Sequence, residues 1–362
     1  MSSPAPPAGL TTPPPLLTVE GLTVRFRGDG RPVQAVNDVS FAVAAGERVG
    51  IVGESGAGKS VTAMALLGLL ASPPATVTGR ASFGSADLLT MGPRQLRSVR
   101  GRRIAMIFQD PVTSLNPRLT VGQHLVEGIR AHERVSRKAA RARGIDLLRR
   151  VEIPAPDRRI DEYPHRLSGG MAQRVMIAIA VSCGPELILA DEPTTALDVT
   201  IEAQIVDLLT ELAEERGTAV VFITHDLALL ARFADRIIVM YGGRVVEEGA
   251  AATIYRDAAH PYTNGLMNAV IRPGRARATR LATIPGDSPS PADLPSGCAF
   301  HPRCAHALDR CREELPSLDR RSETDSHRCA CHLVTRPWIG DPEAIAATPV
   351  VLKDRRVGTL DR

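Results

Sequence analysis

Residues 53 to 60 of this chain read Gly53-Glu54-Ser55-Gly56-Ala57-Gly58-Lys59-Ser60, a full match to the pattern G-x-x-x-x-G-K-[ST]. A β-like run, Arg48 to Val52, precedes the octet, and the helix-forming segment Val61 to Leu70 follows it. This strand, loop and helix context disfavours the alternative of a glycine-rich turn that binds nothing. The glycines let successive N–H groups point inward and form an anion nest at the positive end of a helix. The octet therefore predicts a nucleotide phosphate site, with Lys59 at the β- and γ-phosphates and the Ser60 hydroxyl on Mg²⁺.

A second candidate anion site lies more than a hundred residues later, at Leu167-Ser168-Gly169-Gly170-Met171, directly before a long apolar helix. A hydroxyl and two glycines at a helix start present unpaired N–H groups and a positive dipole end. Taken alone, an ordinary N-cap by Ser168 explains the same residues. Because one nucleotide does not need two phosphate-binding loops, the motifs around this segment decide between the two interpretations.

An apolar run ending in two acids, Leu187 to Glu192, predicts a buried parallel strand that carries carboxylates to its carboxyl end. Asp191 suits the binding of Mg²⁺. Glu192, one residue further on, suits the orientation or deprotonation of an attacking water. The alternative, a strand that ends in a solvated acidic turn, is disfavoured by the phosphate loop upstream.

Two more predicted strands end in polar side chains. Ile104 to Phe108 is a short apolar strand followed by Gln109, whose amide oxygen can bind Mg²⁺ or water. Ala219 to Asp226 is a buried-strand pattern whose end leaves the sheet at His225. A lone histidine is usually structural, but the carboxyl ends of parallel strands are where α/β sheets bind ligands. We therefore expect Gln109 and His225 near the nucleotide.

Taken together, these motifs resemble, in their order, the ATP-binding subunit of an ABC transporter. The resemblance implies Walker A at Gly53 to Ser60, the Q-loop at Gln109 and the signature at Leu167 to Met171. It further implies Walker B at Leu187 to Asp191, catalytic Glu192, a D-loop at Ala196-Leu197-Asp198 and a switch histidine at His225. Phe26, at the end of an early β-like segment, matches the aromatic that stacks on adenine, and Thr62 completes the expected ATP-binding set.

In that family the signature of one subunit covers the nucleotide on the Walker A loop of another, so that two subunits enclose two ATP molecules. The second candidate anion site, Leu167 to Met171, would then bind the nucleotide of a partner chain. The implied fold is α/β: a P-loop core of ABC type with an N-terminal antiparallel β subdomain and an inserted helical subdomain. Strand-like alternation over Leu16 to Val43 and Ala75 to Phe83 agrees with the β subdomain.

A closer resemblance is to the ATPases of dipeptide, oligopeptide and nickel importers, over about Leu16 to His332. It is carried by Phe108 to Pro111 running into Thr113 to Pro117, Tyr163-Pro164-His165, Ala190 to Thr200, His260-Pro261-Tyr262-Thr263 and a cysteine-containing C-terminal extension. It implies an ATPase that drives import of short peptides, or alternatively of nickel or another small solute. Its partners would be a second ATP-binding subunit, alike or unlike, two transmembrane permeases and an extracytoplasmic solute-binding protein. The protein would be located at the cytoplasmic face of the inner membrane.

Length and composition agree with this interpretation. The chain has 362 residues, of which 44% are hydrophobic, which is enough for a substantial core. No apolar run approaches the ~20 residues of a membrane-spanning helix, and we expect no signal peptide. The predicted plan is a disordered lead at 1–15, an ATPase domain at 16–255 with its helical subdomain at about 110–167, the extension at 256–336 and a flexible tail at 337–362.

The segment Leu119 to Arg166 has helical spacing, and Arg130 to Arg150 carries eight Arg or Lys residues. A nucleic-acid surface would need aromatic stacking residues, which this segment lacks, so a solvated helix is favoured. The net charge of +4 does not call for nucleic acid either. A soluble ABC protein acting on nucleic acid or ribosomes usually has two ATPase modules or a long insertion, and neither is found here. An ATP-binding protein without turnover is disfavoured by Glu192 and His225.

Five of the six cysteines fall between residues 298 and 331, interleaved with histidines. A cytosolic site argues against disulfides, which leaves metal binding, redox sensing or buried thiols. The resemblance implies an iron–sulfur cluster, with zinc as the alternative, held by Cys298, Cys304, Cys311 and Cys331, and Cys329 spare. Cys183, alone in an apolar segment, is expected in the core.

Overall fold

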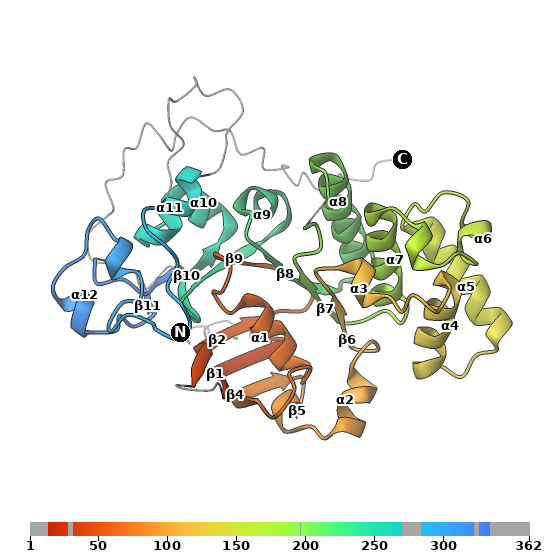
Figure 1. Ribbon diagram of the computed structural model, residues 1–362, viewed down its shortest axis with the longest axis horizontal. Helices are drawn as coiled ribbons and strands as arrows, with labels where there is room; N and C mark the ends of the chain where they lie inside the picture. The colour runs from red at the N-terminus through yellow and green to blue at the C-terminus, as the bar shows by residue number, and fades with distance from the viewer. Residues whose placement is uncertain (1–13, 28–31, 196, 270–283, 322–325, 334–362) are drawn as a thin grey trace, which may run out of the picture.

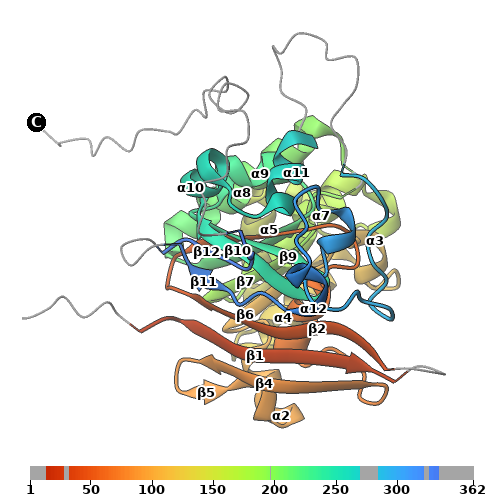
Figure 2. The same cartoon turned by 90° about the vertical axis from the view of Figure 1, so that its left-hand side faces the viewer.

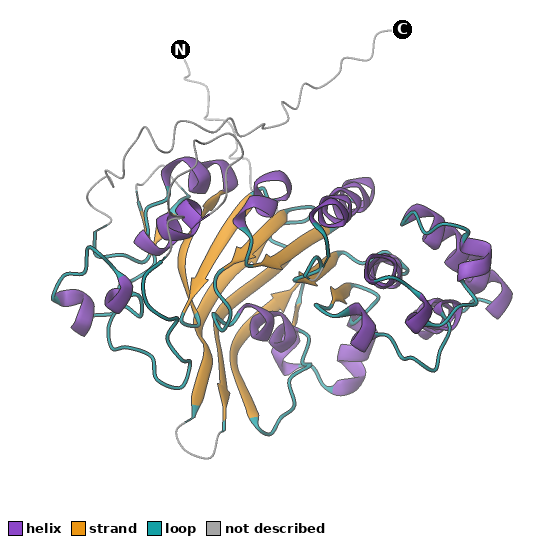
Figure 3. Cartoon of the chain, turned by 45° about the horizontal axis from the view of Figure 1, so that its top comes forward, coloured by secondary structure: helices purple, strands orange, loops and turns teal. Residues whose placement is uncertain are grey.

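The computed structural model describes residues 14–27, 32–195, 197–269, 284–321 and 326–333. The predicted lead and tail lie almost wholly outside these residues. Two β-sheets form the centre of the molecule, with helices around them (Figures 1 and 3). Within the described residues, no helix combines the length and the apolar character needed to span a bilayer.

The smaller sheet is antiparallel and confirms the predicted N-terminal β subdomain. Its four strands, in spatial order, are β2 (Val33–Val43), β1 (Leu17–Phe26), β4 (Ala75–Phe83) and β5 (Ala86–Asp87). Along β1, Leu17, Val19, Leu22 and Val24 are buried: alternate side chains of a strand point to the same face, and an irregularity between Val19 and Leu22 shifts the alternation by one residue. The sheet therefore packs one apolar face against the rest of the domain.

The larger sheet contains eight described strands. In spatial order they are β11 (Asp319–Arg320), β12 (Arg328–Cys329), β10 (Arg244–Ala250), β9 (Arg236–Tyr241), β3 (Arg48–Val52), β8 (Ala219–Thr224), β7 (Leu187–Asp191) and β6 (Ile104–Ile107). The run from β9 to β6 is parallel, whereas β10, β12 and β11 add an antiparallel edge. The predicted strands at Arg48, Ile104, Leu187 and Ala219 are all present.

Helices surround this sheet. They are α1 (Lys59–Leu66), α2 (Pro93–Val99), α3 (Pro111–Ser114), α4 (Val121–His132), α5 (Arg137–Arg150), α6 (Pro156–Arg159), α7 (Gly169–Val181), α8 (Val199–Arg216), α9 (Leu227–Phe233), α10 (Ala251–Asp257), α11 (Pro261–Ala269) and α12 (Arg310–Glu313), with 3₁₀ turns η1 (Leu88–Thr90), η2 (Pro164–Arg166) and η3 (His301–Arg303). Helix α1 starts two residues before the predicted segment and ends at Leu66, where the chain turns.

The central strands are apolar on both faces, as a covered parallel sheet requires. On β7, Ile188 and Ala190 belong to a core shared with the helices, whereas Leu187 and Leu189 belong to a core shared with the small sheet and α1. The sheet is therefore the middle layer of the domain. Its carboxyl edge carries the predicted catalytic side chains.

The inserted segment forms helices, as predicted. Helices α4 and α5 pack on each other and on α7, at the right of Figure 1. The basic residues of α5 are solvated or paired with acids: Arg141 with Asp161, Arg149 with Asp146 and Asp157. Cys183 lies half-buried in the turn after α7 rather than in its core.

The C-terminal extension is joined to the ATPase sheet, a feature that the sequence did not predict. Strand β12 pairs with β10, with Glu247 opposite Cys329, and β11 pairs with β12. Figure 2 shows the extension in blue beside β10 and β9. The predicted domain limits remain a prediction.

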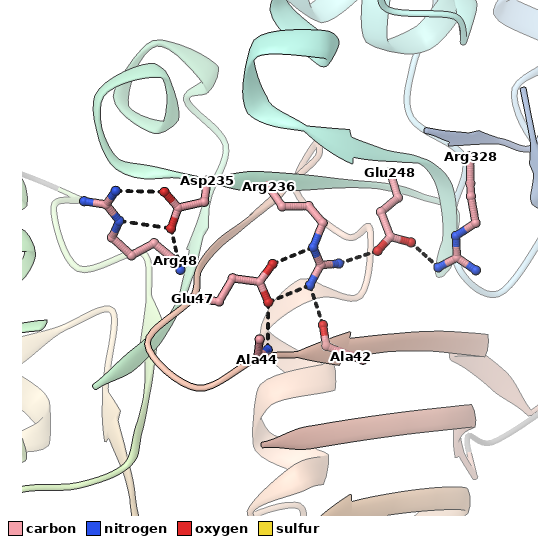
Figure 4. A network of polar contacts seen from close by, with 8 residues as sticks. All are labelled: Ala42, Ala44, Glu47, Arg48, Asp235, Arg236, Glu248 and Arg328. Atoms are coloured by element: carbon pink, nitrogen blue, oxygen red, sulfur yellow. Dashed lines mark hydrogen bonds and ion pairs between the residues drawn. The ribbon is translucent and has the colours of Figure 1, made fainter. Parts of the chain in front are cut away.

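A row of charged side chains crosses from the small sheet to the extension (Figure 4). Arg236 on β9 binds both carboxylate oxygens of Glu47, at 2.7 and 3.1 Å, and also pairs with Glu248 on β10. Glu248 in turn pairs with Arg328 on β12. Glu47 directly precedes β3, and Arg328 belongs to the C-terminal extension. Arg236 and its partners therefore link the segment before β3, the strands β9 and β10, and the extension.

Candidate functional site

The Gly53 to Ser60 loop connects β3 to α1. Gly58 caps α1 with φ +92°, and a Cβ there would lie 2.4 Å from the Ala35 carbonyl oxygen, so only glycine fits. Lys59 is buried, and its Nζ donates to the carbonyl oxygens of Gly53 at 2.7 Å and Glu54 at 3.0 Å. Burial lowers the pKa of Lys59, although nearby carboxylates partly oppose this shift. The ammonium group is thus held within the loop that is predicted to bind phosphate.

Asp191 ends β7 beside this loop. The Ser60 hydroxyl donates to Asp191 Oδ1 at 2.7 Å, and the carboxylate is 5% exposed. Burial raises the pKa of Asp191 and outweighs the opposing hydrogen bond from Ser60. A hydroxyl and a carboxylate at this distance are the oxygen ligands that Mg²⁺ prefers. The structure therefore brings together two of the three side chains predicted to hold the metal ion.

Glu192 is the meeting point of three loops. Gln109 Nε2 donates to Glu192 Oε2 at 2.9 Å, and His225 Nδ1 lies 3.4 Å from Glu192 Oε1. Thr195, which the sequence analysis missed, donates its hydroxyl to Glu192 Oε2 at 2.8 Å. Glu192 also has a left-handed backbone with φ +43°, a conformation that is uncommon for non-glycine residues. A carboxylate held this way can orient or deprotonate a water molecule.

The predicted signature residues begin α7. Ser168 is its N-cap, and its hydroxyl accepts the Met171 N–H at 3.3 Å. Ser168 and Gly169 are exposed, and a Cβ on Gly170 would lie 3.0 Å from the Ile201 side chain. The capping interaction is thus real, and it leaves the helix start accessible from solvent. Leu167 and Met171 pack against the core behind it.

The remaining predicted nucleotide residues occupy different surroundings. Phe26, half-buried at the end of β1, packs against the core of the small sheet. Thr62 is buried and its hydroxyl donates to the Gly58 carbonyl at 2.9 Å, inside α1. Asp198 caps α8 by accepting the N–H groups of Thr200 and Ile201. In the loop itself, Ser55 and Gly56 are exposed and Ala57 is buried, while Ala196 lies outside the described residues.

The four cysteines predicted to act together line one small pocket. Cys298, Cys304, Cys311 and Cys331 share it with His260, His301, His306 and His332. Cys329, the predicted spare residue, is fully buried on β12 and does not line it. Burial raises the pKa of Cys331 to about 11 and raises that of Cys298 and Cys304, with neighbouring cysteines adding to the effect. Across the described residues, no three His, Cys, Asp or Glu side chains are grouped as a metal ion would require.

Comparison with known proteins decides the family. Residues 36–195 match the model described as "ABC transporter", and residues 246–311 match "Oligopeptide/dipeptide transporter, C-terminal region". The chain is 49% identical over 317 residues to the dipeptide transport ATP-binding protein of Escherichia coli (strain K12), covering 88% of this chain and 96% of that one. This chain belongs to the family of ABC transporter ATP-binding proteins. It is accordingly an ATPase that uses ATP and Mg²⁺.

Other relatives agree. A probable peptide ABC transporter ATP-binding protein of Sinorhizobium fredii is 49% identical, over 87% of this chain and 94% of that one. Among solved structures, a dimeric ATP-binding cassette in a post-hydrolysis state, bound to ADP and Pi, matches with a TM-score of 0.59 and 31% identity. That match covers 65% of this chain and 98% of the cassette. The predicted ABC fold is thereby confirmed.

Proposed function

We propose that this chain is the ATP-hydrolysing subunit of a membrane importer for short peptides. The observation that carries the proposal is the match over almost the full length of relatives named for dipeptide or peptide transport, together with the match of the extension at residues 246–311. Its partners would be a second ATP-binding subunit, two transmembrane permeases and an extracytoplasmic solute-binding protein. The chain would sit on the cytoplasmic face of the membrane as a peripheral subunit.

In this proposal the described loops divide the work at one nucleotide. Lys59 and the N–H groups of residues 53–60 bind the phosphates, and Ser60, Asp191 and Gln109 hold Mg²⁺. Glu192 positions the attacking water, and His225 and Gln109 hold Glu192 through the contacts described above. The start of α7 with its signature residues Leu167 to Met171, of which Ser168 and Gly169 are exposed, covers the nucleotide of the second subunit. Support for that role comes from its accessibility and from the dimeric state of a matching cassette.

Uptake measurements test the transported solute. A strain lacking this gene should lose uptake of labelled dipeptides or oligopeptides and regain it with the wild-type gene but not with the Glu192→Gln variant. Loss of nickel uptake with normal peptide uptake would support the alternative, a nickel importer. If neither changes while the purified chain hydrolyses ATP, the peptide assignment is wrong and the ATPase assignment stands.

We also propose that Cys298, Cys304, Cys311 and Cys331 hold a metal centre, an iron–sulfur cluster or alternatively zinc. The support is that these four thiols line the same pocket; because no three of them are grouped closely enough to bind a metal ion in this structure, they would have to move together on binding it. Metal analysis and visible absorbance of anaerobically purified protein test this, with Cys298→Ser expected to lose the metal. Cys183→Ser, outside the extension, is the matched control. Colourless, metal-free wild-type protein would contradict the proposal.

A further inference from the structure

The C-terminal extension reaches the phosphate loop at Glu54. Arg303, the last residue of η3, forms a two-pronged ion pair with this side chain: Nη1 to Oε2 at 2.7 Å and Nη2 to Oε1 at 3.1 Å. The Ser288 hydroxyl donates to the same carboxylate. Residues almost 250 positions apart in the chain thus meet beside the predicted phosphate site.

Arg303 is held in place on its own side of the contact. Its side chain is 7% exposed, and its Nε donates to the Pro285 carbonyl at 2.9 Å. The guanidinium also lies 5.9 Å from the ring centre of Tyr241 and 6.0 Å from that of Phe300. A planar guanidinium fixed on these sides can present both nitrogens to one carboxylate at little further entropic cost.

The loop backbone is fixed from the extension side as well. The Glu54 N–H donates to the Tyr262 hydroxyl at 2.8 Å. Tyr262 is fully buried, with its ring centre 4.5 Å from that of Tyr241 and 5.4 Å from that of Phe300. The carbonyl oxygens of Gly53 and Glu54 accept the Lys59 ammonium group. Arg303 and Tyr262 therefore both contact Glu54, one of the two residues whose carbonyl oxygens accept hydrogen bonds from the phosphate-binding lysine.

We propose that Arg303 is a positioning residue for ATP: through Glu54 it holds the start of the phosphate loop in the shape that receives the nucleotide, with Tyr262 fixing the backbone. The proposal rests on the assignment of Gly53 to Ser60 as the ATP phosphate loop. If the loop is already ordered before ATP binds, less of the binding free energy is needed to order it. Loss of the contact should therefore weaken ATP binding more than it slows the chemical step. In this proposal the C-terminal extension stabilises the nucleotide site.

Steady-state ATPase assays and binding of a fluorescent ATP analogue to purified full-length chain test this. Arg303→Met should raise KM for ATP and Kd for the analogue by roughly tenfold and change kcat by less than about twofold. Arg303→Lys, which keeps the charge but loses the two-pronged geometry, should fall between wild type and Arg303→Met. Arg310→Met, which removes an exposed ion pair with Glu314 in the same extension, is the control and should leave both constants unchanged.

A double-mutant cycle with Glu54→Gln separates positioning from general loss of structure. If Arg303 acts through Glu54, the double variant should bind the analogue no more weakly than Arg303→Met alone. Independent, multiplying effects, or unchanged KM and Kd in folded Arg303→Met and Arg303→Lys, would overturn the proposal. Absence of ATP binding by the wild-type chain would instead remove the underlying assignment of the phosphate loop.

Discussion

Gln109 and Glu192 contact each other through side chains that follow two adjacent parallel strands. Strands β6 and β7 pair with Ile107 opposite Ala190, and each predicted active-site residue follows its strand by one or two positions. Gln109 Nε2 thereby reaches Glu192 Oε2 at 2.9 Å. Movement of the Gln109 loop would break this hydrogen bond, so the contact links the position of that loop to the proposed catalytic carboxylate.

Replacing Glu192 by Gln should slow ATP hydrolysis by about 100-fold or more and leave ATP binding intact, because the amide keeps the shape but cannot accept a proton from water. Single-turnover hydrolysis and equilibrium ATP binding measure the two effects. Glu211→Gln, on the exposed surface of α8, is the control. Near-normal turnover in Glu192→Gln would exclude Glu192 as the catalytic base.

Replacing Ser168 by Arg should leave ATP binding to the chain's own phosphate loop unchanged and reduce hydrolysis at the partner's site by roughly tenfold or more. The reason is that a bulky side chain at the exposed start of α7 would keep a second subunit from closing there. Mixed dimers of one Ser168→Arg chain and one chain with wild-type Ser168 assign the loss of hydrolysis to one site. In each dimer Glu192→Gln is placed in only one of the two chains, so that only the phosphate loop of the other chain can hydrolyse ATP. A loss at the mutated chain's own phosphate loop would contradict coverage by the partner.

Replacing Arg236 by Met should destabilise the chain by about 3 kcal/mol, since Glu47 and Glu248 would lose a shared, largely buried partner. The unfolding midpoint in urea measures this. Arg232→Met is the matched control, because its ion pair with Asp207 is more than half exposed on both sides and such pairs contribute about 1 kcal/mol or less. Equal effects of the two substitutions would show that Arg236, in the row of charges in Figure 4, contributes no more to stability than an exposed ion pair, and would contradict the prediction.

Stability should fall as the pH drops from about 6.5 toward 4, in part because of His260. Burial lowers the pKa of His260 in the folded chain to about 4, whereas the unfolded chain has the ordinary value near 6.5. Between these values the unfolded state binds the extra proton, so the folded state loses stability as the pH decreases, at most by about 3 kcal/mol.

The partners of His260 shape the same transition. Its ring Nδ1 accepts the Tyr262 backbone N–H at 3.0 Å. Glu247 accepts the backbone N–H of His260 at 3.0 Å and pairs with buried His327 at 2.7 Å. Burial would raise the pKa of Glu247, but hydrogen bonds from His327 and others outweigh it, so its stabilisation is lost only at lower pH. His260→Asn should flatten melting temperature against pH between 6.5 and 5, whereas the control, exposed His165→Asn, should not. An unchanged slope in His260→Asn would contradict this prediction.

Local sequence patterns determined the central fold. Short-range sequence patterns alone specify the phosphate loop and three of the strands. These patterns are the octet Gly53 to Ser60 and the apolar runs before Gln109, Glu192 and His225. Because parallel strands end at one edge of a sheet, these runs were enough to predict that the three side chains lie near the nucleotide; their direct contacts were not predicted. Thr195 escaped prediction because a threonine in a turn has many uses, and only its 2.8 Å contact with Glu192 distinguishes it.

Only the tertiary structure placed the extension. Nothing in the local sequence around Arg303 or Tyr262 indicates Glu54 as their partner, since contacts across more than 200 residues depend on how separate segments pack rather than on local pattern. The same holds for β12, two residues long, whose pairing with β10 decides where the cysteine pocket lies. The sequence by itself determined the ATPase core and the edge of the sheet that carries the predicted catalytic side chains; packing of the extension against that core decided which distant residues contact Glu54.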